Sequence, residues 1–148
     1  MNLTSLVELA NRDEAFASIA DSALRHRGER VVCDEALRPL VASQIALNDE
    51  SGLLIVCPTA REAEELAQTL AEGLRERETV FFPSWETLPH ERLSPSAETV
   101  GRRLEVLRAI RVAKQPLIVV TPVRALLQPI VASIGDVPPV ELAVGSEI

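Results

Sequence analysis

The sequence predicts an α/β fold of three layers, in which helices cover both faces of a parallel β-sheet. Short apolar runs bounded by glycine, proline or charged residues alternate with longer segments whose apolar residues recur at helical spacing. Such alternation places a helix in each crossover between parallel strands. Two of the runs, residues 52–57 (GLLIVC) and 116–121 (PLIVVT), are almost continuously apolar. Strands buried on both faces have this composition.

Composition indicates a soluble globular chain of one domain. Its 148 residues are 47% hydrophobic but only 3% aromatic, so we expect an aliphatic core. The formal net charge of -7 disfavours DNA binding by these residues themselves. Cys33 and Cys57 form no CxxC pair, and we expect reduced core thiols and no bound metal. Without a signal peptide or an apolar run that spans a bilayer, the sequence predicts a cytoplasmic protein with no membrane partner.

Residues 1–28 are predicted to form a helical N-terminal segment, followed by the α/β domain over residues 29–135. The first segment contains helices over 4–9 and 12–27, and Gly28 ends the second. Residues 30–33 are predicted to form the first strand and residues 36–47 a helix. The apolar face of that helix comprises Leu37, Leu40, Val41 and Ile45.

After the second strand, residues 52–57, Thr59 and Glu62 have the spacing of a capping box at a helix start. The core-facing residues of this helix are Ala63, Leu66, Ala67, Leu70 and Leu74. A third strand is predicted over residues 79–82, and residues 83–96 form a loop with three prolines and the only tryptophan.

Ser96 is predicted to cap the helix that follows this loop. Its core-facing residues are Val100, Leu104, Leu107 and Ile110. Residues 116–121 form the fourth strand, and Thr121 with Pro122 is predicted to cap a short helix that ends near residue 128. Residues 136–148 begin the next subdomain, with a strand over 140–144.

The turn after the first predicted strand is where a phosphate-binding loop would lie, because nucleotide sites occur at the carboxyl ends of parallel strands. This turn reads Cys33, Asp34, Glu35, Ala36, Leu37 and Arg38. It has neither the glycines nor the lysine of a phosphate loop, and its two carboxylates repel a polyphosphate. We therefore expect no ATP and no other cofactor here. The alternative is a stand-alone nucleotide-binding regulator or enzyme that uses the strand ends near Asp34, Glu35 and Thr59.

Other patterns of catalytic residues fail on spacing. The acidic pair Asp34 and Glu35 is similar to the DEAD-type magnesium site of helicases, but no phosphate loop precedes it, and acidic residues are common at helix starts. His90 and Glu91 lack the second histidine of a zinc protease, since Ser94 stands at that position. No G-x-S-x-G elbow exists. The sequence predicts no catalytic residue.

The loop over residues 83–96 and the helix after it are the candidate interdomain or partner surface. The residues of this surface are Trp85, Leu88, His90, Arg92, Arg102 and Arg103. Alternatively, Trp85 and Leu88 fold back onto the sheet edge. We expect the cations of the helix to form a solvated face rather than a nucleic-acid patch; they are Arg102, Arg103, Arg108, Arg111 and Lys114.

Three segments, in this order, resemble bacterial transcription-repair coupling factors (Mfd). They read LLIVCPTAREAEELAQTL, FFPSWETLPHERLSPSAETVGRRLEVLRAI and IVVTPVRALLQP. The similarity covers roughly residues 29–145, and the tryptophan-proline loop is its most specific part. The resemblance implies the N-terminal module of a large ATP-dependent DNA translocase that displaces stalled RNA polymerase and recruits the excision-repair protein UvrA.

The same resemblance implies a degenerate P-loop NTPase (RecA-like) fold, similar to the first subdomain of the repair helicase UvrB but without its phosphate loop. The chain is thus expected to be a non-catalytic scaffold whose direct partners are other domains of the same protein. ATP and Mg²⁺ belong to the downstream motor of the parent, and UvrA, RNA polymerase and DNA to the full-length protein. The aromatic hairpin of UvrB is also missing, since the chain has no tyrosine. The UvrA-binding surface of the family lies mainly in the next subdomain, so no contact residue is carried over.

Overall fold

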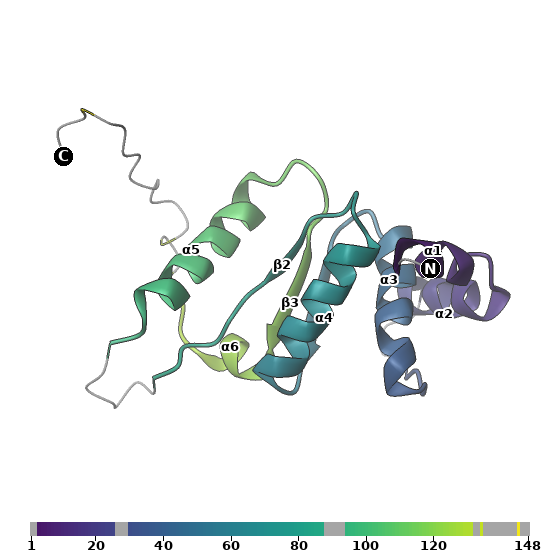
Figure 1. The fold of residues 1–148 in the computed structure, drawn as a ribbon, viewed down its shortest axis with the longest axis horizontal. Helices are drawn as coiled ribbons and strands as arrows, with labels where there is room; N and C mark the ends of the chain where they lie inside the picture. The colour runs from purple at the N-terminus through teal and green to yellow at the C-terminus, as the bar shows by residue number, and fades with distance from the viewer. Residues whose placement is uncertain (1–2, 26–29, 88–93, 132–133, 135–144, 146–148) are drawn as a thin grey trace.

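The structure is a computed structural model that describes residues 3–25, 30–87, 94–131, 134 and 145. Figure 1 shows the order of its elements. They are α1 (Leu3–Ala10), α2 (Glu14–Arg25), the 3-10 turn η1 (Glu35–Leu37), α3 (Arg38–Asn48), β1 (Leu53–Cys57), α4 (Ala60–Gly73), β2 (Thr79–Phe81), α5 (Ala97–Val112), β3 (Ile118–Pro122) and α6 (Val123–Leu127).

The described residues form a three-stranded parallel sheet in the order β1-β3-β2. Leu53 of β1 and Thr79 of β2 both lie opposite Ile118, so β3 is the central strand. This confirms the predicted α/β class and the parallel sheet. Because β1 and β2 each have one neighbour, each presents a free edge in this part of the chain.

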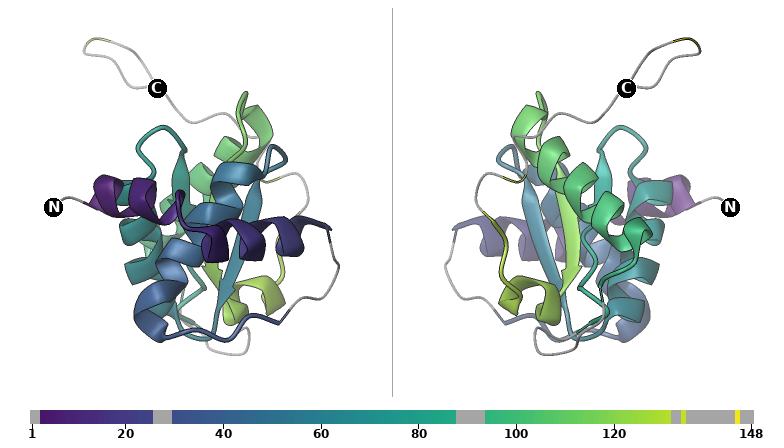
Figure 2. Two further views of the ribbon diagram at one scale, coloured as in Figure 1. Left: turned by 90° about the vertical axis from the view of Figure 1, so that its right-hand side faces the viewer. Right: turned by 90° about the vertical axis from the view of Figure 1, so that its left-hand side faces the viewer.

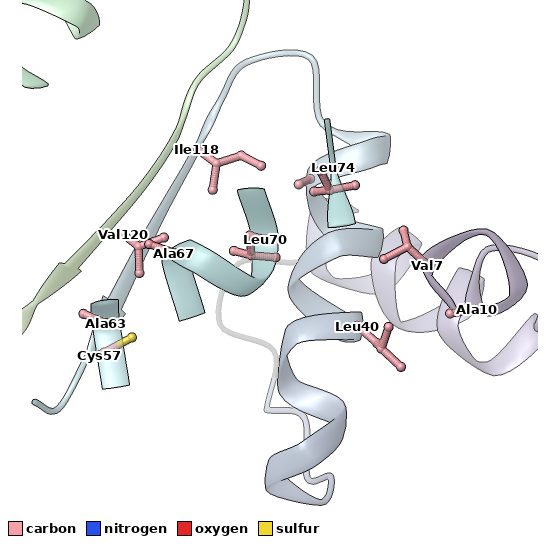
Figure 3. Close-up of a cluster of buried hydrophobic side chains, with 11 residues drawn as sticks. Val7, Ala10, Leu40, Cys57, Ala63, Ala67, Leu70, Leu74, Ile118 and Val120 are labelled. Atoms are coloured by element: carbon pink, nitrogen blue, oxygen red, sulfur yellow. The ribbon is translucent and has the colours of Figure 1, made fainter. Parts of the chain in front are cut away.

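Helix α4 covers one face of the sheet and forms the main core. The predicted apolar face of this helix is confirmed, with Ala63 and Leu70 fully buried. Figure 3 shows these side chains together with Ile118 and Val120 from β3, Val7 from α1 and Leu40 from α3. Helix α1 packs closely against the end of α4 because Gly73 of α4 has no side chain. A Cβ at this position would lie 3.2 Å from Cγ2 of Val7 in α1.

Helices α5 and α6 lie on the opposite face, so the sheet is covered on both sides (Figure 2). Phe82, Val106 and Ala125 form a second, smaller core, which Val80 and Val119 join from the strands. On this face the outward side chains of β1 are less covered: Leu54 is 56% exposed and Val56 45% exposed. On the second face, α5 and α6 therefore cover mainly β2 and β3.

The strand predicted over residues 30–33 is wrong. These residues are described and belong to no sheet, and Val32 is 85% exposed. An apolar run forms a strand only where a neighbouring strand satisfies its backbone groups, and none of the described residues supplies one. The strand predicted over residues 140–144 and the stop at Gly28 lie outside the described residues.

Two helices bury a different face from the predicted one. Helix α3 buries Ser43, Gln44 and Ala46 beside Leu40, because α1 and α2 pack against this side, and Gln44 Nε2 donates to the carbonyl of Val7 at 3.2 Å. The buried residues of α5 are Arg103 and Val106, while Ile110 is 48% exposed. Periodicity alone misplaces both faces, since a polar side chain that finds a partner can be buried.

The helix caps predicted at Thr59 and Ser96 are confirmed, whereas α6 begins after Pro122 without a side-chain cap, because the Thr121 hydroxyl donates to the carbonyl of Phe82 instead. The Thr59 hydroxyl accepts from the N–H of Glu62 at 3.2 Å and donates to its Oε1 at 3.1 Å. The Ser96 hydroxyl accepts from the N–H of Thr99 at 3.1 Å. Among the helices in the described part of the chain, none has the length and apolar character needed to cross a bilayer.

Candidate functional site

An open trough of about 810 Å³ runs along the free edge of β1, and we call it the β1 trough. Its walls come from α3, α4, the five residues of β1 and the segment before η1. The apolar lining from the helices consists of Pro39, Val41, Ala42, Ile45 and Leu66. The charged lining consists of Arg30, Glu35, Arg38, Glu62 and Glu65.

The predicted phosphate-loop position lies partly in this trough. Cys33, Glu35 and Arg38 line it, while the other three residues of the turn, Asp34, Ala36 and Leu37, are exposed and outside its lining. Arg38 Nη1 lies 3.8 Å from Glu35 Oε1, so part of its charge is already offset. The trough lining contains no glycine and no lysine. Its chemistry therefore differs from that of a phosphate cradle.

The carboxyl end of β1 carries the thiol of Cys57, which stays protonated beside the carboxylate of Glu62. Burial, and next the neighbouring Glu62, raise the pKa of Cys57, while Arg38 lowers it. Cys57 is buried, as predicted, but Cys33 is only half-buried; both are free thiols. A neutral buried thiol is a poor nucleophile and a poor metal ligand. In the described part of the chain, no three His, Cys, Asp or Glu side chains are grouped so as to hold a metal ion.

A second cluster surrounds Arg103, which α5 carries to the carboxyl side of β2. The guanidinium lies between the rings of Phe82 and Trp85, 4.2 Å from each centroid. Arg103 Nη1 donates to the carbonyl of Pro83 at 2.6 Å, and the residue is only 2% exposed. Desolvation lowers the pKa of this group. Two stacked rings and a carbonyl thus hold a buried cation without a carboxylate.

Gln128, just after α6, fixes the backbone of Trp85. Its Oε1 accepts from the N–H of Trp85 at 2.7 Å, and its Nε2 donates to the carbonyl of Trp85 at 3.2 Å. The Thr121 hydroxyl donates to the carbonyl of Phe82 at 2.9 Å. The start of the loop is therefore held by side chains of β3, α5 and the end of α6.

The comparisons with known proteins give one consistent answer. No protein-family model matches the chain. The chain is 41% identical to the transcription-repair-coupling factors of Mycobacterium bovis and Mycobacterium tuberculosis over 98% of its length. Over 60% of its own length, the chain is also 33% identical to the transcription-repair-coupling factor of Haemophilus influenzae.

The chain belongs to the transcription-repair-coupling factor family. It spans only 12% of each mycobacterial relative and 8% of the Haemophilus one, so most of each relative lies outside the matched segment.

Within this member of the transcription-repair-coupling factor family, the candidate surface residues have different environments. Trp85 is half-buried and packs against Arg103 of α5. Arg103 is not part of an exposed surface, because its stack with the two rings removes it from water. Arg102 is exposed and pairs with Glu98 at 2.8 Å and with Glu64 at 3.7 Å. The other three, Leu88, His90 and Arg92, lie outside the described residues.

Sequence reasoning missed Phe82, Glu86 and Gln128. For Phe82 the sequence held one usable signal. An aromatic side chain at the end of a strand is a surface on which an arginine readily stacks. Gln128 had none: it lies 43 residues from Trp85, and a lone glutamine after a helix is usually solvated.

Glu86 links the loop to the start of α5 and gives the fold a pH dependence. Its carboxylate accepts from the hydroxyl of Ser96 at 2.6 Å and from the hydroxyl of Thr99. These bonds, that from Ser96 first, lower the pKa of Glu86 from 4.5 to about 2. A lowered pKa contributes stability that is complete above pH 4.5 and lost as the pH falls towards 2.

We therefore expect the start of α5 to loosen between these pH values, measured by amide exchange at Thr99. The substitution Glu86→Gln removes this transition because the amide does not ionise. Glu98→Gln, at an exposed carboxylate of the same helical turn, keeps it. Identical pH profiles for Glu86→Gln and the unchanged chain contradict the assignment.

Proposed function

We propose that this chain is a non-catalytic scaffold domain at the N-terminus of a transcription-repair-coupling factor. Its fold is a degenerate P-loop NTPase fold, similar to the first subdomain of UvrB and RecA-like in layout. The observation that carries the proposal is the acidic lining of the β1 trough near the carboxyl end of β1, where a nucleotide-binding relative would hold phosphates.

Electrostatics supports the absence of a nucleotide. A triphosphate requires backbone N–H groups that approach it closely and a cation that offsets its charge. Three carboxylates line the trough, Glu35, Glu62 and Glu65, against the two cations Arg30 and Arg38, and Arg38 lies near Glu35. The neighbouring Thr59 hydroxyl is already used to cap α4. The residues present do not fit ATP or its magnesium ion, which we assign to the downstream motor of the parent.

The role of the domain follows from that of the whole protein. We propose that the whole protein is a cytoplasmic ATP-dependent DNA translocase. It displaces RNA polymerase stalled at DNA damage and recruits UvrA for nucleotide excision repair. Within it, this domain holds the adjoining repair-recruitment subdomain and packs against other domains. The net charge of -7 supports contact with protein domains rather than with DNA.

Titration calorimetry of the chain with Mg-ATP, and separately with duplex DNA, tests the proposal. We expect no saturable heat for either ligand. Binding in the micromolar range would overturn the scaffold assignment and favour the nucleotide-binding alternative. A thermal-shift screen gives a second readout, because a nucleotide present at 100 times its dissociation constant adds about 2.7 kcal/mol of apparent stability.

A further inference from the structure

Gln128 pairs with the backbone of Trp85 in the way that a residue of one strand pairs with a residue of the next. Its side-chain amide accepts from the N–H of Trp85 at 2.7 Å and donates to the carbonyl of the same residue at 3.2 Å. Opposite residues of antiparallel strands exchange the same two bonds through their backbones. A primary amide has both the acceptor and the donor that this pairing requires, whereas a carboxylate only accepts. One side chain thus bonds both polar backbone groups of Trp85.

The backbone geometry of Gln128 is set by the residue that follows it. Gln128 ends α6 in an extended conformation, with φ -87° and ψ 139°. Proline disfavours the helical conformation of the residue before it, so Pro129 holds Gln128 in this geometry. Pro129, Ile130 and Val131 are exposed and have apolar side chains, so within residues 128–131 only Gln128 can form side-chain hydrogen bonds. The direction in which the chain leaves α6 is therefore linked to the position of one amide.

The indole of Trp85 carries this contact on to α5. Because both backbone groups of Trp85 are bonded, its ring is held against the guanidinium of Arg103, 4.2 Å from the ring centroid. Arg103 is 2% exposed and donates to the carbonyl of Pro83 at 2.6 Å, so it has little freedom to follow a displaced ring. A displacement of Gln128 thus removes bonds from Trp85 and disturbs the packing of Arg103.

We infer that Gln128 is a positioning residue that couples the direction of the chain leaving α6 to the packing of Trp85 on Arg103. A chain that leaves α6 in another direction withdraws the amide from Trp85, and the loosened Trp85 then changes its contact with α5. This contact lies within the described residues and does not depend on the proposed function. Its use in the parent does rest on the proposed function: the contact holds the adjoining subdomain, which follows α6 in the chain, in a fixed direction.

Two signals from Trp85 test the contact: the exchange rate of its N–H and the fluorine resonance of the chain labelled with fluorotryptophan. Trp85 is the only tryptophan, so the label gives one resonance. Gln128→Leu replaces the amide with an apolar group of similar size, and we expect about tenfold faster exchange and a shifted resonance. Gln128→Glu keeps an acceptor but no donor, so its exchange rate should be intermediate. An unchanged rate in Gln128→Leu contradicts the contact.

The control for these variants is Gln68→Leu. Gln68 is an exposed glutamine of α4 whose amide donates only to the side chain of Glu72, at 3.4 Å. We expect this substitution to leave the exchange rate and the resonance of Trp85 as they are. A response equal to that of Gln128→Leu would show that the effect is not specific to Gln128.

Pro129→Ala tests the coupling itself, because it frees the backbone of Gln128 without removing a buried side chain. We expect the N–H of Trp85 to exchange about threefold faster and the resonance to move towards its position in Gln128→Leu. A purely local role of Gln128 predicts no response to a change outside the contact. The inference is overturned if Gln128→Leu changes both signals and Pro129→Ala changes neither. Titration with nucleotide is a separate readout: saturable binding contradicts the proposed function and leaves this coupling intact.

Discussion

Replacing Arg103 with alanine is expected to lower the free energy of unfolding by about 3 kcal/mol, the range of large truncations at buried sites. The substitution removes a side chain that is 2% exposed and leaves a cavity between Phe82 and Trp85. It also leaves the carbonyl of Pro83 without its donor. Because Trp85 is the only tryptophan, its fluorescence should shift towards that of exposed indole. Urea denaturation monitored by this signal measures both effects.

The adjacent residue supplies the control for this substitution. Arg102 is exposed and forms surface ion pairs, so Arg102→Ala should change stability by less than about 1 kcal/mol. The substitution Arg103→Lys should recover little, because an ammonium does not stack as a plane between two rings. Equal effects of Arg102→Ala and Arg103→Ala would show that the stack does not stabilise the fold.

Replacing Leu70 with alanine is expected to cost about 3–4 kcal/mol. Leu70 is fully buried in the core between α4 and the sheet, so neighbours on several elements lose contact at once. The same change at Leu47, which is 43% exposed on α3, should cost less than half as much. Urea denaturation of the two variants makes the comparison. Similar losses for both would mean that this core does not dominate stability.

The elements that the sequence predicts correctly are those set by local chemistry. Residues 53–57 are apolar without interruption and residues 118–122 are apolar except for Thr121, and both runs form strands. The helix starts at Thr59 and Ser96 follow from side chains that reach a backbone N–H three residues away. Such contacts need no knowledge of the rest of the fold.

The predictions that failed depend on neighbours distant in sequence. The run at residues 30–33 has strand-like composition, but no described strand pairs with it. The buried face of α5 includes Arg103 because Phe82 and Trp85 lie opposite it, a fact that periodicity does not contain. Gln128 enters the candidate site for the same reason, since its two bonds to Trp85 join segments that only the tertiary fold brings together.

The most direct measurement is a titration of the isotope-labelled chain with Mg-ATP, followed by the backbone amide resonances of Glu35, Cys57 and Glu62. A scaffold whose strand ends repel phosphate predicts no saturable shift of these three resonances at millimolar nucleotide. Saturable shifts centred on them would show that the trough holds a nucleotide, and the account of a non-catalytic domain would be wrong.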